Sequence, residues 1–432
     1  MKQKPKSGPR FFKPAPKVKK VEQKICEVAI ERLSDEGRGI GFLQGKVVFV
    51  AGALPGEKAK VRVLDEKRNL IEAELIELTA RSAQRIEPGC PLFGRCGGCQ
   101  LQMLDDSAQL AHKQHILAHL LKPVAENMQW EKPLTATPWN YRHRARLAVT
   151  AIDGQPAVGF KSANSHQVIP VPACPILDAR LQPLLDGLPQ WLAQLSEWRR
   201  VEEILIAVDA NGQLALDWNI QRASPKADAE KFQALAQAAG VICGPHAVLN
   251  YTVPGSNSAF DFSVRDFTQV NPAINDQLVQ RALEWLAPMP ADQIADLFCG
   301  LGNFTLPLAR NAQAVVGYEG SSVMVERART NAVARSSSAT FEALDLFEKA
   351  AQLPDRFNKV LLDPPRAGAK AVCGQLAQSK QVQCIVYVSC NPQTLLRDLG
   401  ILTAGGFNLD RAALVDMFPQ TGHCETLVQL KR

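Results

Sequence analysis

One apolar stretch of the sequence, IVYVSCNPQTLLRDL at residues 385–399, ends in a thiol that is followed by Asn-Pro. The pattern predicts a buried strand up to Ser389 and a helix after Pro392. Cys390 then stands at the end of the strand, and the Asn-Pro turn directs its thiol toward a cleft. A cysteine in this position is typical of a covalent nucleophile, provided that the site helps the thiolate to form.

Such a thiolate is needed when carbon 5 of a pyrimidine is methylated, because carbon 5 alone is too weak a nucleophile. Addition of sulfur to carbon 6 turns the ring into an enolate, and a general base later removes the proton from carbon 5. The C-terminal stretch FPQTGHCETLVQLKR offers Glu425 as this base, at the start of the last strand, with His423 as its competitor. The rival thiols are Cys299, Cys384 and Cys424. Cys384 begins its strand at the wrong end and Cys299 lies inside a glycine-containing loop, so we prefer Cys390.

The stretch DLFCGLGNFTLPLA, residues 296–309, predicts a strand, a glycine turn and a helix. Gly300 and Gly302 permit a tight turn and close approach of a ligand. Glu319, the last residue of the next predicted strand, is placed to accept both hydroxyl groups of a ribose. An acid at 296, a glycine turn and a second acid fit S-adenosylmethionine, which has no phosphate to bind. The alternative is an ordinary strand–helix turn with a capping acid.

A second loop, LLDPPRAG at residues 361–368, follows another predicted strand. Asp363 and its two prolines predict a rigid extended loop beside the methyl donor. Similar acid-Pro-Pro turns occur in methyltransferases that act on exocyclic amines, where an aromatic residue usually follows. Arg366 occupies that region here, which argues against an amine target.

The sequence contains 11 cysteines, a large number for a chain without disulfides. Three of them form a C-x5-C-x2-C pattern, Cys90, Cys96 and Cys99, and Cys174 follows in VPACPIL. Two thiolates across two glycines, with more distant partners, are typical of tetrahedral sulfur ligation of a metal centre. The spacing alone leaves zinc and an iron-sulfur cluster equally open.

These residues need elements that bring them together. From about residue 265, apolar strands alternate with amphipathic helices, which predicts an α/β fold with a doubly wound, Rossmann-like parallel sheet. Ligands of such sheets lie at the carboxyl ends of the strands. Asp296, Glu319, Asp363 and Cys390 all stand at or just past such ends, so we expect them at one edge.

The remaining chain predicts three further parts. Residues 1–19 begin a disordered basic arm rich in lysine, suited to neutralising phosphates, although a merely solubilising tail is the alternative. Residues 20–80 alternate in the strand period between glycines, which predicts a small closed OB-like barrel. Residues 81–264 predict a central α+β domain with the metal cysteines, and its helix at 105–122 is expected to pack on the catalytic domain, residues 265–432.

The stretch WNYRHRARL, residues 139–147, interleaves aromatic and basic side chains. Arginines at alternate strand positions share a face, where they can meet phosphates while aromatic rings stack on unpaired bases. We therefore predict an RNA contact by Trp139, Tyr141, Arg142, Arg144 and Arg146, with a solvated strand face as the alternative.

At 432 residues with 46% apolar residues and no long apolar run, the chain is expected to be cytoplasmic, monomeric and without membrane contact.

Together, FTQVNP (267–272), DLFCGLGNF, LLDPPRAG, VYVSCNP and GHCETL resemble the bacterial RNA 5-methyluridine methyltransferase family, and the similarity covers nearly the whole chain after the basic arm. The resemblance implies Cys390 as nucleophile and Glu425 as proton-abstracting base. It implies S-adenosylmethionine binding by Gln269, Phe298, Asn303, Glu319, Asp363 and, on less distinctive surroundings, Asp345.

The same resemblance implies a TRAM domain in the barrel and a [4Fe-4S] cluster on Cys90, Cys96, Cys99 and Cys174. Family members that act on transfer RNA lack these cysteines, and another ribosomal RNA member lacks the barrel. Having both, the chain is most similar to the type that methylates one uridine of 23S ribosomal RNA. We expect that uridine to be flipped out of its stack to reach the thiol.

Four alternative functions stay open. Radical methylthiotransferases also combine a TRAM barrel, an iron-sulfur cluster and S-adenosylmethionine, but they need a C-x3-C-x2-C loop. The chain could instead be a TRAM-containing RNA-binding protein without catalytic activity, but that function does not explain Cys390 and Glu425. Cytosine methylation uses the same thiol chemistry and needs an acid at ring nitrogen 3, a role that Asp363 can fill. Methylation of transfer RNA or of another ribosomal site is the nearest alternative.

Overall fold

The computed structural model describes residues 24–125, 128–163, 165–220, 225–252, 259–348 and 352–432. The chain divides into two compact units, one made of the residues up to Arg32 with Gly39–Arg81, the other of Leu33–Arg38 with Ser82–Arg432. The predicted basic arm lies outside the described residues. Within the described ranges, no helix has the length and apolar character that crossing a bilayer requires.

The first unit is a closed five-stranded barrel, in the strand order β1-β2-β3-β5-β4. Its strands are β1 (Ile25–Leu33), β2 (Gly39–Leu43), β3 (Lys46–Val50), β4 (Lys58–Glu66) and β5 (Leu70–Ala80). Alternate residues such as Val28 and Ile30 fill the barrel core, as the strand period requires. The five-stranded barrel predicted from the sequence is therefore confirmed.

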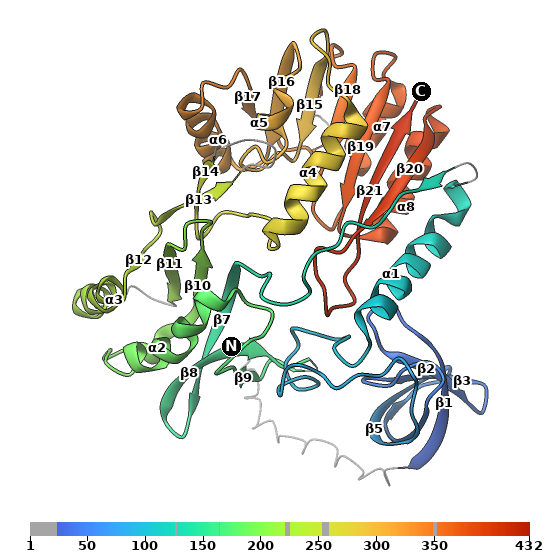
Figure 1. Ribbon diagram of the computed structural model, residues 1–432, viewed down its shortest axis with the longest axis vertical. Coiled ribbons are helices and arrows are strands. Elements are labelled where there is room, and N and C mark those ends of the chain that lie inside the picture. Colours follow the sequence, from blue (N-terminus) through green and yellow to red (C-terminus); the bar gives the residue numbers. More distant parts are fainter. Residues whose placement is uncertain (1–23, 126–127, 164, 221–224, 253–258, 349–351) are drawn as a thin grey trace, which may run out of the picture. The chain divides into compact units, whose positions relative to one another are not determined.

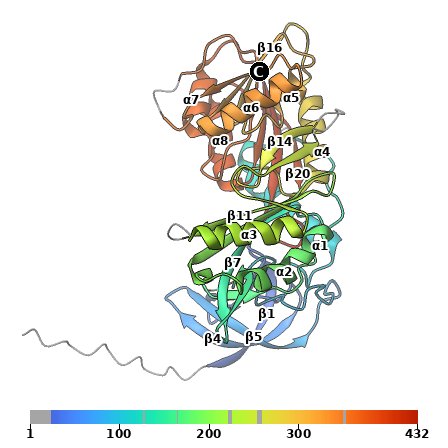
Figure 2. The same ribbon diagram turned by 90° about the vertical axis from the view of Figure 1, so that its left-hand side faces the viewer.

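The second unit contains a six-stranded sheet in the order β12-β11-β10-β7-β8-β9. The strands are β7 (Arg144–Ile152), β8 (Gln155–Lys161), β9 (Val168–Pro170), β10 (Val201–Val208), β11 (Leu214–Ile220) and β12 (Val241–Cys243). Helices α2 (Gln182–Leu192) and α3 (Lys226–Ala238) lie together against it (Figure 2). Leu188 and Phe232 on these helices share one core with Ile204 of β10.

The catalytic half is built on an eight-stranded sheet in the order β17-β16-β15-β18-β19-β21-β20-β6 (Figure 1). Its strands are β6 (Gln129–Trp130), β15 (Gln293–Leu297), β16 (Ala314–Glu319), β17 (Thr340–Ala343), β18 (Lys359–Leu362), β19 (Cys384–Ser389), β20 (Asn408–Val415) and β21 (Glu425–Lys431). β15 to β19 are parallel to one another, and β21 inserts antiparallel between β19 and β20. The predicted doubly wound sheet is confirmed.

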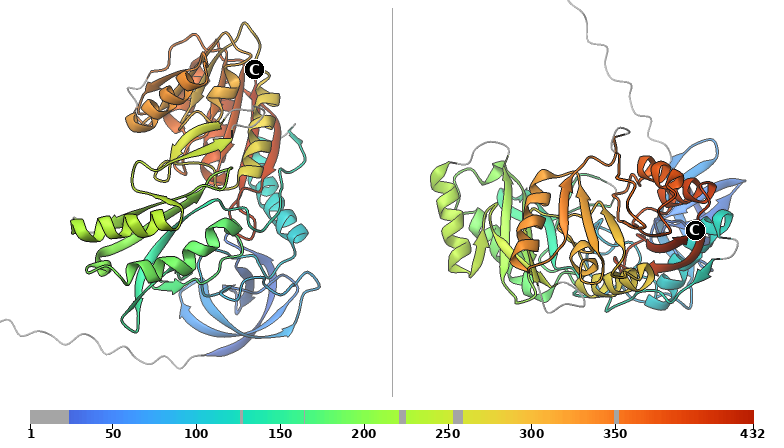
Figure 3. Two further views of the ribbon diagram at one scale, coloured as in Figure 1. Left: turned by 60° about the vertical axis from the view of Figure 1, so that its left-hand side comes forward. Right: turned by 90° about the horizontal axis from the view of Figure 1, so that it is seen from above.

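Helices cover both faces of this sheet, as the apolar strands require. On β18, Leu361 belongs to one core, whereas Val360 and Leu362 belong to the other. Helices α4 (Pro272–Leu286) and α6 (Ser322–Ala334) pack in the first core, and α7 (Lys370–Gln378) and α8 (Pro392–Ala404) in the second. Figure 3 shows α4, in yellow, along its face of the sheet.

Helix α1 (Asp106–Leu121) packs on the catalytic sheet although it lies far from it in sequence. The Lys113 side chain is 1% exposed, and its Nζ donates to Asp416 Oδ1 at 2.6 Å and to Phe418 O at 3.0 Å. Gln109 and Gln420 exchange hydrogen bonds, with Gln109 Nε2 to Gln420 Oε1 at 2.9 Å and Gln420 N to Gln109 Oε1 at 3.1 Å. α1 thereby fixes the loop that leads into β21.

Candidate active site

A cavity of about 320 Å³ lies at the carboxyl ends of the parallel strands. The six residues predicted to bind the methyl donor all line it, namely Gln269, Phe298, Asn303, Glu319, Asp345 and Asp363. They come from the loops after β15, β16, β17 and β18 and from the segment before α4. The topology thus brings together residues up to 94 positions apart, as between Gln269 and Asp363.

The turn after β15 has a backbone that approaches the cavity closely. Phe298 has φ +65° and Gly302 has φ +91°, and a Cβ atom at Gly302 would lie 2.9 Å from Phe341 Cζ. Gly300 N donates to Glu319 Oε2 at 3.2 Å, and Ser321 N donates to Glu319 Oε1 at 2.9 Å. Two backbone amides therefore hold the Glu319 carboxylate in place beside the glycine turn.

Asp296, the first acid of the glycine motif, does not line the cavity. Its side chain is 0% exposed, and Thr305 Oγ1 donates to its Oδ2 at 2.5 Å. Burial, with smaller contributions from the neighbouring Asp363 and Glu319, raises the pKa of Asp296 to about 7. Asp296 therefore holds the start of α5 (Thr305–Leu308) to the end of β15.

Strand register places the predicted nucleophile beside the predicted base. β19 and β21 pair antiparallel with Ser389 opposite Thr426, so that Cys390 and Glu425 are the next residues on the two strands. Cys390 is partly exposed, whereas the rival thiols Cys299, Cys384 and Cys424 are buried. The cysteine that best combines access with a neighbouring carboxyl group is Cys390.

The electrostatics of this pair favour neutral groups at rest. Burial, then Glu425 and Asp363, raises the pKa of the Cys390 thiol to about 11, while Arg366 acts in the opposite direction. Burial and the nearby Asp363 raise the pKa of Glu425 to about 8. Glu425 is 5% exposed, and within the described residues its Oε2 has no hydrogen-bond partner. This carboxyl oxygen is left available for a proton.

The Asn-Pro turn after the nucleophile joins two loops. Asn391 Oδ1 accepts from Gln393 N at 3.1 Å and caps α8, while its Nδ2 donates to Arg366 O at 3.0 Å. Thr394 Oγ1 donates to the same carbonyl at 3.2 Å. The turn thus locks the loop containing Asp363 against the one containing Cys390, which explains why the strand ends as it does.

Sequence reasoning missed several aromatic residues of the cavity. Tyr251 and Phe260 reach it from the hairpin β13 (Val248–Thr252) and β14 (Ala259–Ser263), and Phe347 lies 5.5 Å from Phe298 between ring centroids. Phe347 is 51% exposed, as is expected of a side chain left open toward a ligand. In the sequence, only the position of Phe347 shortly after Asp345 could have indicated that it lies at the cavity.

The four predicted metal cysteines line a cavity of about 130 Å³. A Cβ atom at Gly97 would lie 3.0 Å from Lys161 O, so the tight turn between Cys96 and Cys99 needs glycine. Burial, with smaller contributions from the surrounding Cys174, Cys96 and Cys90 thiols, raises the pKa of Cys99 to about 12. Yet no three His, Cys, Asp or Glu side chains in the described ranges are arranged to hold a metal ion.

The RNA contact predicted for residues 139–147 is wrong for two residues. Tyr141 is 7% exposed and donates from its hydroxyl to Pro419 O at 3.1 Å. Arg144 is largely enclosed and donates to Asp266 O, Val264 O and Thr268 Oγ1. These two side chains stabilise the interior, and the prediction remains for Trp139, Arg142 and Arg146.

Comparison with known proteins supports this arrangement at two levels. The model of the TRAM domain matches residues 19–76, and that of the tRNA (Uracil-5-)-methyltransferase family matches residues 247–432. The crystal structure of Pyrococcus abyssi tRNA (uracil-54, C5)-methyltransferase with S-adenosyl-L-homocysteine superposes with a TM-score of 0.73 at 21% identity, covering 94% of this chain and 100% of that one. The C-terminal part of the chain therefore has the fold of an S-adenosylmethionine-dependent methyltransferase.

Curated relatives define the family more narrowly. The 23S rRNA (uracil(1939)-C(5))-methyltransferase RlmD of Pectobacterium carotovorum subsp. carotovorum (strain PC1) is 39% identical, with 97% of each chain covered. RlmD of Azoarcus sp. (strain BH72) is 40% identical, covering 93% of this chain and 99% of its own. The chain belongs to the RlmD family of 23S rRNA (uracil-C5)-methyltransferases.

Proposed function

We propose that this chain methylates carbon 5 of one uridine in 23S ribosomal RNA, with S-adenosylmethionine as the methyl donor. One observation carries the proposal: a partly exposed thiol, Cys390, and a buried carboxyl group, Glu425, are neighbours at the sheet edge that forms the donor cavity. The printed activities of the relatives agree with this chemistry. The TRAM domain and the basic arm fit an RNA partner.

In the proposed reaction, Cys390 loses its proton to solvent and its sulfur forms a bond to carbon 6 of the uracil ring, so that the ring electrons move to oxygen 4. Carbon 5 of this enolate then takes the methyl group, whose bond to the donor sulfur breaks, so that the donor would leave as S-adenosylhomocysteine. Glu425 accepts the proton of carbon 5, and the electrons left behind restore the ring double bond and expel the thiolate.

The donor, when bound, supplies an electrophilic methyl group, and the six cavity residues would hold it. We propose that Glu319 accepts from the ribose hydroxyls, because its carboxylate is already fixed by Gly300 N and Ser321 N. Phe298, Phe347 and Asp345 would surround the adenine, and Gln269, Asn303 and Asp363 the methionine part.

Replacing Glu319 by Gln is expected to raise the dissociation constant of S-adenosylmethionine about tenfold or more, the effect of losing a charged hydrogen bond. The matched control is Glu342→Gln, an exposed position on β17, which should bind the donor as the wild type does. Isothermal titration calorimetry measures both, and thermal unfolding checks that the glycine turn survives. Unchanged affinity in Glu319→Gln would remove Glu319 from the donor site.

We further propose that Cys90, Cys96, Cys99 and Cys174 hold a [4Fe-4S] cluster. They line one cavity, and burial raises the pKa of the Cys96, Cys99 and Cys174 thiols, so that these three need a metal cation nearby to lose their protons. Thiols that surround a space, instead of converging on a point, fit a polynuclear cluster better than a single zinc ion. Methyl transfer by this route consumes no electrons, so the cluster would order the RNA-binding surface or the central domain.

Anaerobically purified wild-type protein should therefore contain iron and acid-labile sulfide in equal amounts. Cys99→Ser should lose most of both, because one ligand of four is removed, whereas Cys243→Ser, at a half-buried thiol outside the cavity, should keep them. Elemental analysis and visible absorption provide the measurement. Stoichiometric zinc without iron would overturn the cluster and leave a metal site.

The substrate itself is tested with labelled methyl donor, purified protein and total RNA from cells that lack the modification. The label is expected in 5-methyluridine of 23S ribosomal RNA after nucleoside analysis. Label in 5-methylcytidine would contradict the target base, and label in transfer RNA would contradict the target molecule.

A further inference from the structure

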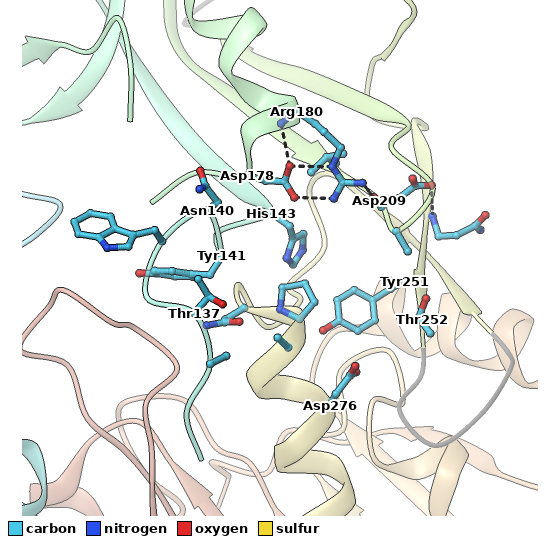
Figure 4. Close-up of a pocket in the computed structure, with 18 residues that line it drawn as sticks. Thr137, Asn140, Tyr141, His143, Asp178, Arg180, Asp209, Tyr251, Thr252 and Asp276 are labelled. Atoms are coloured by element: carbon cyan, nitrogen blue, oxygen red, sulfur yellow. Dashed lines mark hydrogen bonds and ion pairs between the residues drawn. The ribbon is translucent and has the colours of Figure 1, made fainter. Parts of the chain in front are cut away.

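A second cavity, of about 610 Å³, lies beside the donor cavity in the same compact unit (Figure 4). Its walls come from the segment before β7, the start of 3-10 helix η2 (Ala179–Leu181), the end of β10, strand β13 and the first turn of α4. Neither Cys390, Glu425 nor Asp363 lines it. The target uridine must reach Cys390, so this cavity is not the place of that base.

Most charges of the cavity already have partners. Arg180 Nη2 donates to Asp178 Oδ2 at 2.6 Å and Arg180 Nε to Asp178 Oδ1 at 2.9 Å, and Arg180 Nη1 donates to Asp209 O at 3.1 Å. The Asp209 carboxylate accepts from the backbone amides of Asn211, Gln213 and Asn250. These acids and the arginine hold the wall together, so they are not free to recognise a ligand.

Two polar groups of the cavity stay without partners among the described residues. Asp276, on the side opposite the Asp178–Arg180 pair in Figure 4, accepts no hydrogen bond there, and burial alone raises its pKa. Asn271 is 0% exposed; its Oδ1 accepts from Ile274 N, but its Nδ2 has no acceptor. Asp276 is half-buried, so its carboxylate is an acceptor open to a ligand, whereas the Asn271 amide is enclosed and belongs to the wall.

The other walls are aromatic and neutral. Trp139 lines the cavity and is fixed by Gly89, where a Cβ atom would lie 3.0 Å from its ring. Burial lowers the pKa of His143 to about 3, so its ring is neutral, and its nitrogens lie 3.2 Å from Val270 O and Thr268 Oγ1. An aromatic wall with one free carboxylate acceptor suits a planar heterocycle with N–H groups better than a phosphate.

We propose that this cavity binds a second, unpaired nucleobase of the RNA substrate, and that the base is a guanine. Guanine offers adjacent N–H groups to the Asp276 carboxylate, the acceptor that the cavity leaves open. The cavity volume lies in the range of small-ligand sites, so a nucleoside fits. The inference rests on the proposed function, because it makes RNA the ligand, and it adds a recognition element beyond the methylated uridine.

The second cavity is joined to the donor cavity by one wall. Tyr251 lines both cavities and its hydroxyl accepts from Asn275 Nδ2 at 2.9 Å. Asn275 and Asn303 exchange amide hydrogen bonds at 2.9 Å, and Asn303 lines the donor cavity. A base held by Asp276 would therefore anchor the RNA a short distance from the reacting groups.

The test uses full-length protein, a 23S ribosomal RNA fragment that contains the target uridine, and the variant Asp276→Asn. Glu284→Gln, an exposed carboxylate on the same helix, is the matched control. We expect Asp276→Asn to weaken RNA binding at least fivefold at fixed salt, with donor binding and thermal unfolding unchanged, and Glu284→Gln to bind as the wild type does. Inosine, which lacks the guanine amino group, then replaces each guanosine in turn.

One inosine position should weaken binding to the wild type and leave binding to Asp276→Asn unaffected. If Asp276→Asn binds the RNA as tightly as the wild type, or if every inosine affects both proteins equally, the second base site does not exist. Measuring methylation by the wild type separates the proposed function from the proposed second base site. A wild type that methylates the fragment without an Asp276 effect upholds the proposed function alone, and an Asp276 effect without methylation upholds the base site alone.

Discussion

Replacing Cys390 by Ala is expected to abolish methylation, with a loss on the order of 10⁴-fold or more, as when other covalent catalysts lose their nucleophile. Without the sulfur, carbon 5 of uracil has no enolate electrons with which to take a methyl group. Donor binding should not change, because Cys390 does not line the donor cavity. Transfer of labelled methyl to 23S RNA, followed in single-turnover reactions, measures the loss.

The matched control is Cys424→Ala, which removes a buried thiol one residue from Glu425 and packed against Leu117 and Leu414. It should retain methylation within a few-fold of the wild type. Strong activity in Cys390→Ala, or its loss in Cys424→Ala with an intact fold, would assign the nucleophile to a different thiol.

Replacing Glu425 by Gln should lower turnover by about 10²- to 10⁴-fold, the usual contribution of a positioned general base. The methyl group still transfers, but the proton of carbon 5 stays, so protein and RNA remain linked through Cys390. A covalent complex that survives denaturing electrophoresis and carries the methyl label is the expected product. A variant that turns over normally, or accumulates no such complex, would exclude Glu425 as the base.

The raised pKa of Glu425 also sets the pH dependence of this step. The carboxyl group must be ionised to accept a proton, and its pKa of about 8 leaves most of it neutral at pH 7. Where proton removal by Glu425 limits the rate, the wild-type rate should therefore rise from about pH 6 and level off above about pH 8. The Glu425→Gln variant should lack that rise in its residual proton-removal step.

Sequence alone predicted which residues gather at one edge of the sheet, because strand ends are local signals. Glu319, Asp363 and Cys390 each close or follow an apolar run, and parallel topology brings such ends to one edge. The position of Glu425 also follows from pattern, because the last strand begins there. Family resemblance added Gln269, Asn303 and Asp345, whose surroundings carry no periodic signal, and all three line the donor cavity.

The sequence could not predict which distant segments pack against each face of a strand. Alternation put Arg144 on one face of β7, but only tertiary structure shows that carbonyl groups of residues 264 and 266 enclose it. Asp296 was expected to help bind the methyl donor because it begins the glycine motif. In the structure, its carboxyl group instead accepts a hydrogen bond from the Thr305 hydroxyl. The two-residue strand β6 and the fit of α1 against residues 416–420 depend on contacts between distant segments, which no local pattern encodes.

The central claim is that the sulfur of Cys390 forms a bond to the uracil ring before the methyl group arrives. RNA with 5-fluorouridine at the target position tests it directly, because fluorine cannot be removed as a proton and the adduct persists. Mass spectrometry of the digested complex should find the methylated fluorouridine attached to the peptide that contains Cys390. A stable adduct on Cys299, Cys384 or Cys424, or transfer of the methyl group without any adduct, would contradict the account.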